Sequence, residues 1–328
     1  MGGWGIDLGT ANTVVCHPRL GVVLDEPSVM VVRVDAPYRP LLVGREAREL
    51  IGRSPVGMLT VRPLRDGVIV DLESARAFIV AIIRRARRRW WGEMRPRAVI
   101  GVPAGATALE RRALLEAADE AGLRRVGLLP EPVAGALGCG VDPLEPRAHL
   151  VVDIGGGTAE VTGFCFGGIL ASRSCRVAGD EMTLALYQHL RTKYQIIVGE
   201  LTVEEVKLRI EGASDAPLVV EGRDAATGRA RLVTLDTEEV MEALRPTTGE
   251  IIQALTSCLE ELPAQAAGDI MADGVLAFGG GSLLRGFTSL LEESFGFSVK
   301  LAERPLTCVA EGAAACLTNP DVLSAYGG

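Results

Sequence analysis

Short apolar runs and segments of helical periodicity alternate along the first half of the chain, a pattern typical of α/β domains. Trp4–Val15 predicts a strand, a glycine turn and the start of a second strand, and Gly21–Leu24 and Ser28–Val34 continue a β meander. Ser74 then caps a predicted long helix, whose apolar face consists of Phe78, Ile79, Ile82, Ile83 and Ala86. Strands and helices alternate after it: Ala98–Pro103, Ala108–Ala121 with a capping box of Thr107 and Glu110, Arg125–Leu129, and Glu131–Leu137.

The second half repeats this order. Leu150–Ile154 predicts a buried strand before the glycine turn Gly155–Gly157, and Ile169–Val177 completes a second meander. The later elements are predicted at Glu181–Lys193, Leu201–Ile210, Asp215–Val233 as a strand pair, Thr237–Leu262 as a helix interrupted at Pro246, and Gly274–Phe278, followed by a glycine turn and a helix from Leu283. Because each half runs strand, glycine turn, strand, strand, helix, strand, helix, we expect two duplicated halves around a cleft.

Composition narrows the class of protein. The chain has 328 residues, of which 48% are hydrophobic and 4% aromatic, enough for two domains with cores of their own. A net charge of −8 argues against a nucleic-acid partner. The seven cysteines form no Cys-x-x-Cys pair, so we expect buried free thiols in a reducing cytoplasm. The start has no leader-like pattern, and no apolar run approaches the roughly 18 residues of a membrane span, so at most a peripheral membrane contact is expected.

The two glycine turns carry the candidate chemistry. Asp7 and Asp153 each end a buried strand directly before a turn, where glycines let backbone N–H groups approach an anion. Two such aspartates facing each other could hold a hydrated Mg²⁺ on a phosphate chain. Neither the dinucleotide-binding nor the Walker glycine pattern is present. Glu131 suits the first turn of its helix, or acts as a general base beside Asp153.

Arginines and tryptophans meet where the predicted long helix ends. Arg84, Arg85, Arg87, Arg88 and Arg89 precede Trp90 and Trp91, which are two of the three tryptophans. Arginines at a helix C-terminus complement its dipole, but adjacent tryptophans in a loop with a basic cluster are typical of a membrane-interface contact. Packing against a neighbouring subunit and burial in the core are the alternatives.

These residues resemble the actin-like ATPase superfamily, and within it the MreB family of bacterial actins. The resemblance runs from about Ile6 to Leu317. It is carried by the segments IDLGTANT, EPSV, VRPLRDGVI, EPVAGALG, VVDIGGGTAEV, RVAGDEM, GRDAATG, GGGSLLRG and AEGAA, in that order.

The resemblance implies an α/β, actin-like (ribonuclease H-like) two-domain fold with duplicated βββαβα cores around an interdomain nucleotide cleft. The first domain would comprise residues 1–141 plus 308–328, with an insertion at about 31–61. The second would comprise residues 142–307, with an insertion at about 181–245.

The resemblance also assigns roles to matched positions. ATP would be bound by Asp7, Gly9, Thr10, Ala11, Asn12, Gly155, Gly156, Gly157, Thr158, Glu204, Glu205, Val206, Lys207, Gly279, Gly280, Gly281, Ser282 and Leu283. Asp7 and Asp153 would hold Mg²⁺ through waters, and Glu131, Thr158 and Asp153 would be catalytic. From the residues alone, Glu204 and Lys207 could equally be a surface ion pair. Ala159 and Pro130 depart from the family pattern, so hydrolysis is expected to be slow.

The implied function is a cytoskeletal ATPase that forms paired protofilaments on the inner face of the cell membrane. It would contact the membrane through Trp90, Trp91 and Met94 with the arginine cluster, and membrane proteins of the cell-wall elongation machinery would be its partners. Nucleic acid is not expected among them. The alternatives are a small-molecule kinase, for which we find no third carboxylate and no sugar-lined cleft, and a chaperone-type ATPase, for which a substrate domain after the ATPase would be needed.

Overall fold

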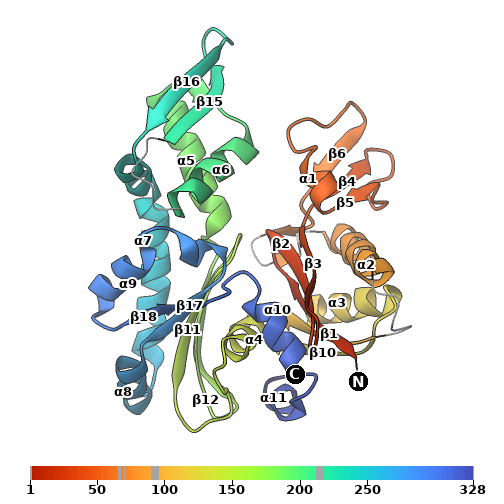
Figure 1. The fold of residues 1–328 in the computed structure, drawn as a ribbon, viewed down its shortest axis with the longest axis vertical. Helices are drawn as coiled ribbons and strands as arrows, with labels where there is room; N and C mark the ends of the chain where they lie inside the picture. The colour runs from red at the N-terminus through yellow and green to blue at the C-terminus, as the bar shows by residue number, and fades with distance from the viewer. Residues whose placement is uncertain (1, 66–67, 70, 90–95, 212–217, 328) are drawn as a thin grey trace.

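The computed structural model describes residues 2–65, 68–69, 71–89, 96–211 and 218–327. Two halves lie side by side, each built on a five-stranded sheet, and an insertion projects from each half toward the same end of the molecule (Figure 1). Within the described ranges, no helix combines the length and the apolarity needed to cross a bilayer.

The first sheet has the order β10-β9-β1-β2-β3. Its strands are β1 (Gly3–Leu8), β2 (Asn12–His17), β3 (Gly21–Pro27), β9 (Arg97–Val102) and β10 (Arg124–Pro130). β1 pairs antiparallel with β2 and parallel with β9. Side chains alternate between its faces: Ile6 and Val15 join the core beneath α2 (Leu72–Arg89) and α3 (Ala108–Glu120), whereas Val14 and Cys16 pack on α10 (Cys308–Ala315).

The second sheet has the order β13-β12-β11-β17-β18. Its strands are β11 (His149–Ile154), β12 (Ala159–Cys165), β13 (Gly168–Cys175), β17 (Val275–Phe278) and β18 (Val299–Leu301). Helices α5 (Gly179–Lys193), α7 (Thr237–Glu261), α8 (Ala264–Asp273) and α9 (Phe287–Phe295) belong to this half. Leu150 and Val152 enter the core shared with several of these helices, and Val151 faces the other way.

Three helices fill the layer between the two sheets: α4 (Glu131–Gly138), α10 and α11 (Pro320–Tyr326). One apolar cluster joins Val99 and Leu129 of the first sheet to Val151 and Phe278 of the second through these helices. The two halves therefore share a core at the end of the molecule opposite the insertions (Figure 1).

The predicted duplication is confirmed by strand order. Read from the third strand of each half, β3-β2-β1-β9-β10 matches β13-β12-β11-β17-β18 position for position. Each half also contains a fifth, parallel strand, β10 or β18, beyond the predicted βββαβα unit.

The insertions contain small sheets of their own. The first holds β4 (Met30–Arg33), β5 (Leu42–Val43), β6 (Met58–Val61) and α1 (Arg45–Arg48), followed by the pair β7 (Leu64–Arg65) and β8 (Val68–Ile69). The second holds β14 (Ile196–Ile197), α6 (Glu200–Glu211), β15 (Leu218–Asp224) and β16 (Ala230–Leu235).

Three local predictions were wrong. The long helix begins at Leu72, because Asp71 and not Ser74 caps it: Asp71 accepts hydrogen bonds from the Glu73 N–H at 3.2 Å and the Ser74 hydroxyl at 2.5 Å. Pro246 does not interrupt α7, since buried side chains on both sides of it, such as Leu244 and Ile251, keep one apolar face.

The third error concerns the helix expected from Leu283. After the third glycine turn the chain forms a 3₁₀ helix, η1 (Gly280–Leu283), and α9 begins only at Phe287. Gly286, which has a left-handed φ of +74°, separates the two helices.

Candidate functional site

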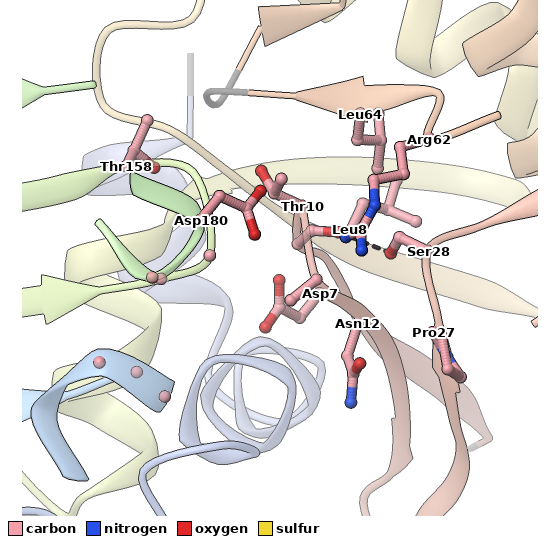
Figure 2. A pocket seen from close by; sticks show the side chains of 18 of the residues that line it. Asp7, Leu8, Thr10, Asn12, Pro27, Ser28, Arg62, Leu64, Thr158 and Asp180 are labelled. Atoms are coloured by element: carbon pink, nitrogen blue, oxygen red, sulfur yellow. Dashed lines mark hydrogen bonds between the residues drawn. The ribbon is translucent and has the colours of Figure 1, made fainter. Parts of the chain in front are cut away.

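A cavity of about 880 Å³ lies in the cleft between the halves and is lined by both predicted phosphate turns. Asp7, Thr10 and Asn12 come from the first turn, and Thr158 from the second (Figure 2). Asp180, at the start of α5, faces Thr10 across the cavity (Figure 2).

Ser28, which follows β3, fixes the first turn by two hydrogen bonds. The Ser28 backbone N–H donates to Ala11 O at 2.8 Å, and the Ser28 hydroxyl donates to Gly9 O at 2.6 Å. Thr13 contacts the same hydroxyl at 3.0 Å. The turn between β1 and β2 is therefore fixed through its carbonyl oxygens.

The second turn approaches the first closely. Its backbone closes on itself through the Gly155 N–H, which donates to Thr158 O at 2.9 Å. A methyl group placed on Gly156 would lie only 3.0 Å from the Cβ of Ala11, so a larger side chain there would push the turns apart. The two glycine turns thus meet across the cleft, an arrangement that the predicted pairing of Asp7 with Asp153 would need.

The third turn packs against the second. Gly279 has φ of +81°, and a side chain on it would overlap the Asp153 carboxylate and the Ile154 carbonyl. The Gly279 N–H donates to Pro305 O at 2.9 Å. Gly279, Gly280 and Gly281 all line the cavity.

Lys207 is buried inside the wall formed by α5 and α6. Its Nζ lies 2.8 Å from Glu204 Oε2 and donates to Gly179 O at 2.7 Å and to Thr183 Oγ1 at 3.0 Å. Only 7% of Lys207 is exposed, so the pair with Glu204 is not a solvated surface ion pair. Both residues line the cavity.

Three acids, Asp7, Glu131 and Asp153, line the cavity, and Glu160 is buried next to Asp153. Burial and the charge of Asp25 raise the pKa of Asp7 to about 7. Burial and neighbouring carboxylates, Asp7 first among them, raise the pKa values of Glu131 and Asp153 well above their usual range. Burial raises the pKa of Glu160, opposite Asp153 in the β11–β12 ladder, to about 6. Burial is the largest cause of each shift, and for Asp7, Glu131 and Asp153 the like charge of neighbouring carboxylates adds to it, so a bound cation would relieve repulsion there.

Most of the predicted binding residues line this cavity, and five do not. Gly157 and Leu283 are outside the lining, and Ser282 is buried with its hydroxyl donating to Gly279 O at 2.7 Å. Val206 packs into the core of the second half and Glu205 is exposed, because consecutive positions on a helix face different directions. The predicted membrane residues Trp90, Trp91 and Met94 lie outside the described residues.

The structure adds cavity residues that the sequence reasoning missed. Asp180 donates its backbone N–H to Gly156 O at 2.7 Å, and burial raises the pKa of its carboxyl. Arg62 reaches across the cleft to Glu200, with Nη2 2.5 Å from Oε1. The segment RVAGDEM contains Asp180, but its sequence gives no sign that it contacts the second glycine turn.

The described residues contain no group of three His, Cys, Asp or Glu side chains placed to ligate a metal ion together. The oxygen ligands at hand are those of Asp7 and Asp153, one from each turn, and they match the preference of Mg²⁺ for carboxylate oxygens and retained waters.

Comparison with known proteins gives one family. A family model described as MreB/Mbl protein matches residues 2–325. The cell shape-determining protein Mbl of Bacillus cereus is 38% identical over 97% of this chain and 96% of its own length. The cell shape-determining protein MreB of Escherichia coli K12 is 40% identical over 97% of this chain and 93% of its own length.

Solved structures show the same fold. MreB5 of Spiroplasma citri bound to AMPPNP aligns with a TM-score of 0.89 at 31% identity, covering 96% of each chain. The same protein has also been solved bound to ADP. A MamK double helical filament aligns at a TM-score of 0.79 and 24% identity, covering 96% of this chain and 98% of its own, which supports the actin-like fold alone.

Proposed function

Because this chain belongs to the MreB/Mbl family, we propose that it is a bacterial actin that binds and slowly hydrolyses ATP and assembles into paired, head-to-tail protofilaments that organise cell-wall synthesis and cell shape. The observation that carries this proposal is the meeting of two glycine turns, each preceded by an aspartate that lines the cavity, at Ala11 and Gly156. MreB5 of Spiroplasma citri, which shares this fold, binds AMPPNP and ADP.

The phosphate chain lies between the turns. Thr10, Ala11 and Asn12 contact it from one side and Gly155–Thr158 from the other, with backbone N–H groups as donors. Asp7 and Asp153 are the residues that would hold Mg²⁺, which would supply positive charge to offset that of the phosphates and of the neighbouring carboxylates. The adenosine lies against Glu204 and Lys207, with the third glycine turn opposite.

Glu131 and Thr158 orient the attacking water. Glu131 is the first residue of α4 and lines the cavity. It packs closely on Gly101 of β9, since a Cβ atom placed on Gly101 would lie only 3.2 Å from Glu131 Cγ. A carboxylate whose pKa is raised accepts a proton from water more readily than an ordinary one. Asp153 contributes to catalysis as one of the two residues that would hold Mg²⁺ next to the phosphates. Most of the rate enhancement comes from positioning and charge stabilisation.

Membrane contact belongs to the same proposal. Trp90, Trp91 and Met94 insert at the lipid interface on the inner face of the cell membrane, and arginines of α2 meet anionic head groups. Arg84 and Arg88 are exposed, whereas Arg85 is already engaged by Glu46 at 3.0 Å. Membrane proteins of the cell-wall elongation machinery are the expected partners.

The first experiment is pelleting with anionic liposomes, with Mg-ATP and without nucleotide, while released phosphate is measured in the same tube. ATP-dependent pelleting with slow phosphate release is expected. Phosphate release with all protein left in the supernatant would favour a kinase-like or chaperone-like cycle, neither of which the family assignment favours.

The tryptophans are tested in the same assay. Trp90→Ala/Trp91→Ala is expected to reduce binding to anionic liposomes several-fold, since two interfacial aromatics contribute on the order of a few kcal/mol of apolar burial. Neutral liposomes separate this contribution from that of the arginines. Equal binding by wild type and variant would assign the tryptophans to subunit packing.

A further inference from the structure

Two cysteines lie where the central helices pack against each other. Cys139 is the C-cap of α4, and Cys308 is the first residue of α10. The helices pack backbone to backbone, because a side chain on Gly138 would overlap the carbonyl oxygen of Cys308 and one on Gly312 would overlap that of Ala134. Cys308 belongs to the buried apolar cluster between the two sheets, and Cys139 packs against that same cluster.

The pair lies at both points where the chain passes between the halves. The first passage runs from the end of α4 to β11, directly after Cys139. The second runs from β18 to α10 and ends at Cys308. A covalent bond between these two residues would therefore fasten both passages together at the joint of the cleft.

The two thiols differ in environment. Cys139 is half-buried, whereas Cys308 is only 1% exposed and its Sγ lies 3.7 Å from Pro305 O. The neighbouring Cys308 thiol lowers the pKa of Cys139, and the Cys139 thiol together with burial raises the pKa of Cys308. Cys139 is thus the accessible nucleophile, and Cys308 is the thiol that resolves it.

We propose that Cys139 and Cys308 form a peroxide-sensitive pair whose disulfide locks the joint between the two halves. The Cys139 thiolate attacks one oxygen of hydrogen peroxide, so an S–O bond forms, the O–O bond breaks and hydroxide leaves as water. Cys308 then attacks the Cys139 sulfur, an S–S bond forms, and the second hydroxide leaves with the Cys308 proton as water. Two thiols are oxidised and one peroxide is reduced to two waters.

The functional consequence rests on the proposed ATPase cycle. Opening and closing of the cleft requires the halves to move about α4 and α10, so the oxidised protein is expected to release phosphate at least several-fold more slowly. Such a reversible bond fits a cytosolic protein, where disulfides are usually transient and redox-sensing.

The test begins with wild-type full-length protein. After brief treatment with hydrogen peroxide and alkylation of free thiols, peptide mass spectrometry is expected to show a Cys139–Cys308 crosslink, which dithiothreitol removes. This readout is independent of ATP turnover, so its failure is distinct from failure of the ATPase proposal. Sulfinic acid on Cys139 without a crosslink, or a crosslink to another cysteine, would overturn the pair.

Two variants connect the crosslink to function. Cys139→Ser is expected to keep basal phosphate release and to lose its sensitivity to peroxide. Cys165→Ser, which removes another half-buried thiol, is expected to behave as wild type. If Cys139→Ser fails to fold, Cys139→Ala replaces it. Equal inhibition of Cys139→Ser and wild type by peroxide would show that the lock acts elsewhere.

Discussion

Removal from water dominates the chemistry of single residues at the cleft. Burial is the largest cause of the raised pKa values of Asp7, Glu131, Asp153 and Glu160. A group whose pKa is raised by folding binds its proton more tightly in the folded than in the unfolded chain. Its contribution to stability is complete below the unfolded pKa and is lost as pH rises through the folded pKa.

For Asp7 this gives a defined pH window. Its pKa rises from 3.8 to about 7, and at about 1.4 kcal/mol per pKa unit its ionisation costs the nucleotide-free fold on the order of 4 kcal/mol. Between pH 5 and pH 8 the melting temperature of nucleotide-free wild type should fall relative to that of Asp7→Asn. In Mg-ATP the wild type should gain more than the variant. A difference in melting temperature that does not change with pH would contradict this account.

Removal of the two carboxylates proposed as catalytic, Glu131 and Asp153, is expected to abolish hydrolysis without unfolding the protein. Glu131→Ala and Asp153→Ala should each abolish most phosphate release while circular dichroism shows an intact fold. Glu238→Ala, which removes an exposed acid from the first turn of α7, is the matched control. Wild-type turnover in both site variants would place the catalytic site elsewhere.

Among the elements, the glycine turns offer the sharpest comparison. Gly279 and Gly228 have φ of +81° and +70°, so alanine at either should cost about 1–2 kcal/mol in backbone strain. Only at Gly279 would the new methyl group also overlap Asp153, whereas nothing lies within 4 Å of it at Gly228. We expect Gly279→Ala to weaken ATP binding measured by calorimetry and Gly228→Ala to leave it unchanged. Equal ATP affinities of Gly279→Ala and Gly228→Ala would show that the third turn does not contact the nucleotide.

Local signals predicted the elements well where the interactions are themselves local. The Thr107–Glu110 capping box is present, with the Thr107 N–H donating to Glu110 at 2.8 Å. The continuation of α7 through Pro246 depends on packing against other elements, which periodicity does not reveal. The same holds for the site: the aspartate–glycine turns have a sequence pattern, but Asp180 and Arg62 reach the cavity only through tertiary contacts.

At the scale of the whole molecule, one ion pair joins the two halves at the mouth of the cleft. Arg62 precedes β7 in the first half, and Glu200 begins α6 in the second. Their side chains are 27% and 53% exposed, so the pair is expected to contribute about 0.5–1 kcal/mol, or a few-fold in nucleotide dissociation.

Charge swapping tests this pair. Arg62→Glu should speed the release of a fluorescent ATP analogue a few-fold in stopped flow, and adding Glu200→Arg should restore most of the wild-type rate. Arg33→Glu, in an exposed pair with Asp35 on the first insertion, should leave the rate unchanged. If the double variant remained as fast as Arg62→Glu, Arg62 would act on the nucleotide itself and not through Glu200.

The two insertions stand at the opposite end of the molecule from α4 and α10 (Figure 1). The two halves are joined at the shared core, far from the insertions. A rotation of the halves about α4 and α10 would move the shared core least, the phosphate turns by an intermediate amount, and the tip of the β15–β16 hairpin most. If the proposed ATPase cycle rotates the halves, the presence or absence of one phosphate group would change the outline of the molecule, and a neighbour touching both tips could detect that change without contacting the nucleotide.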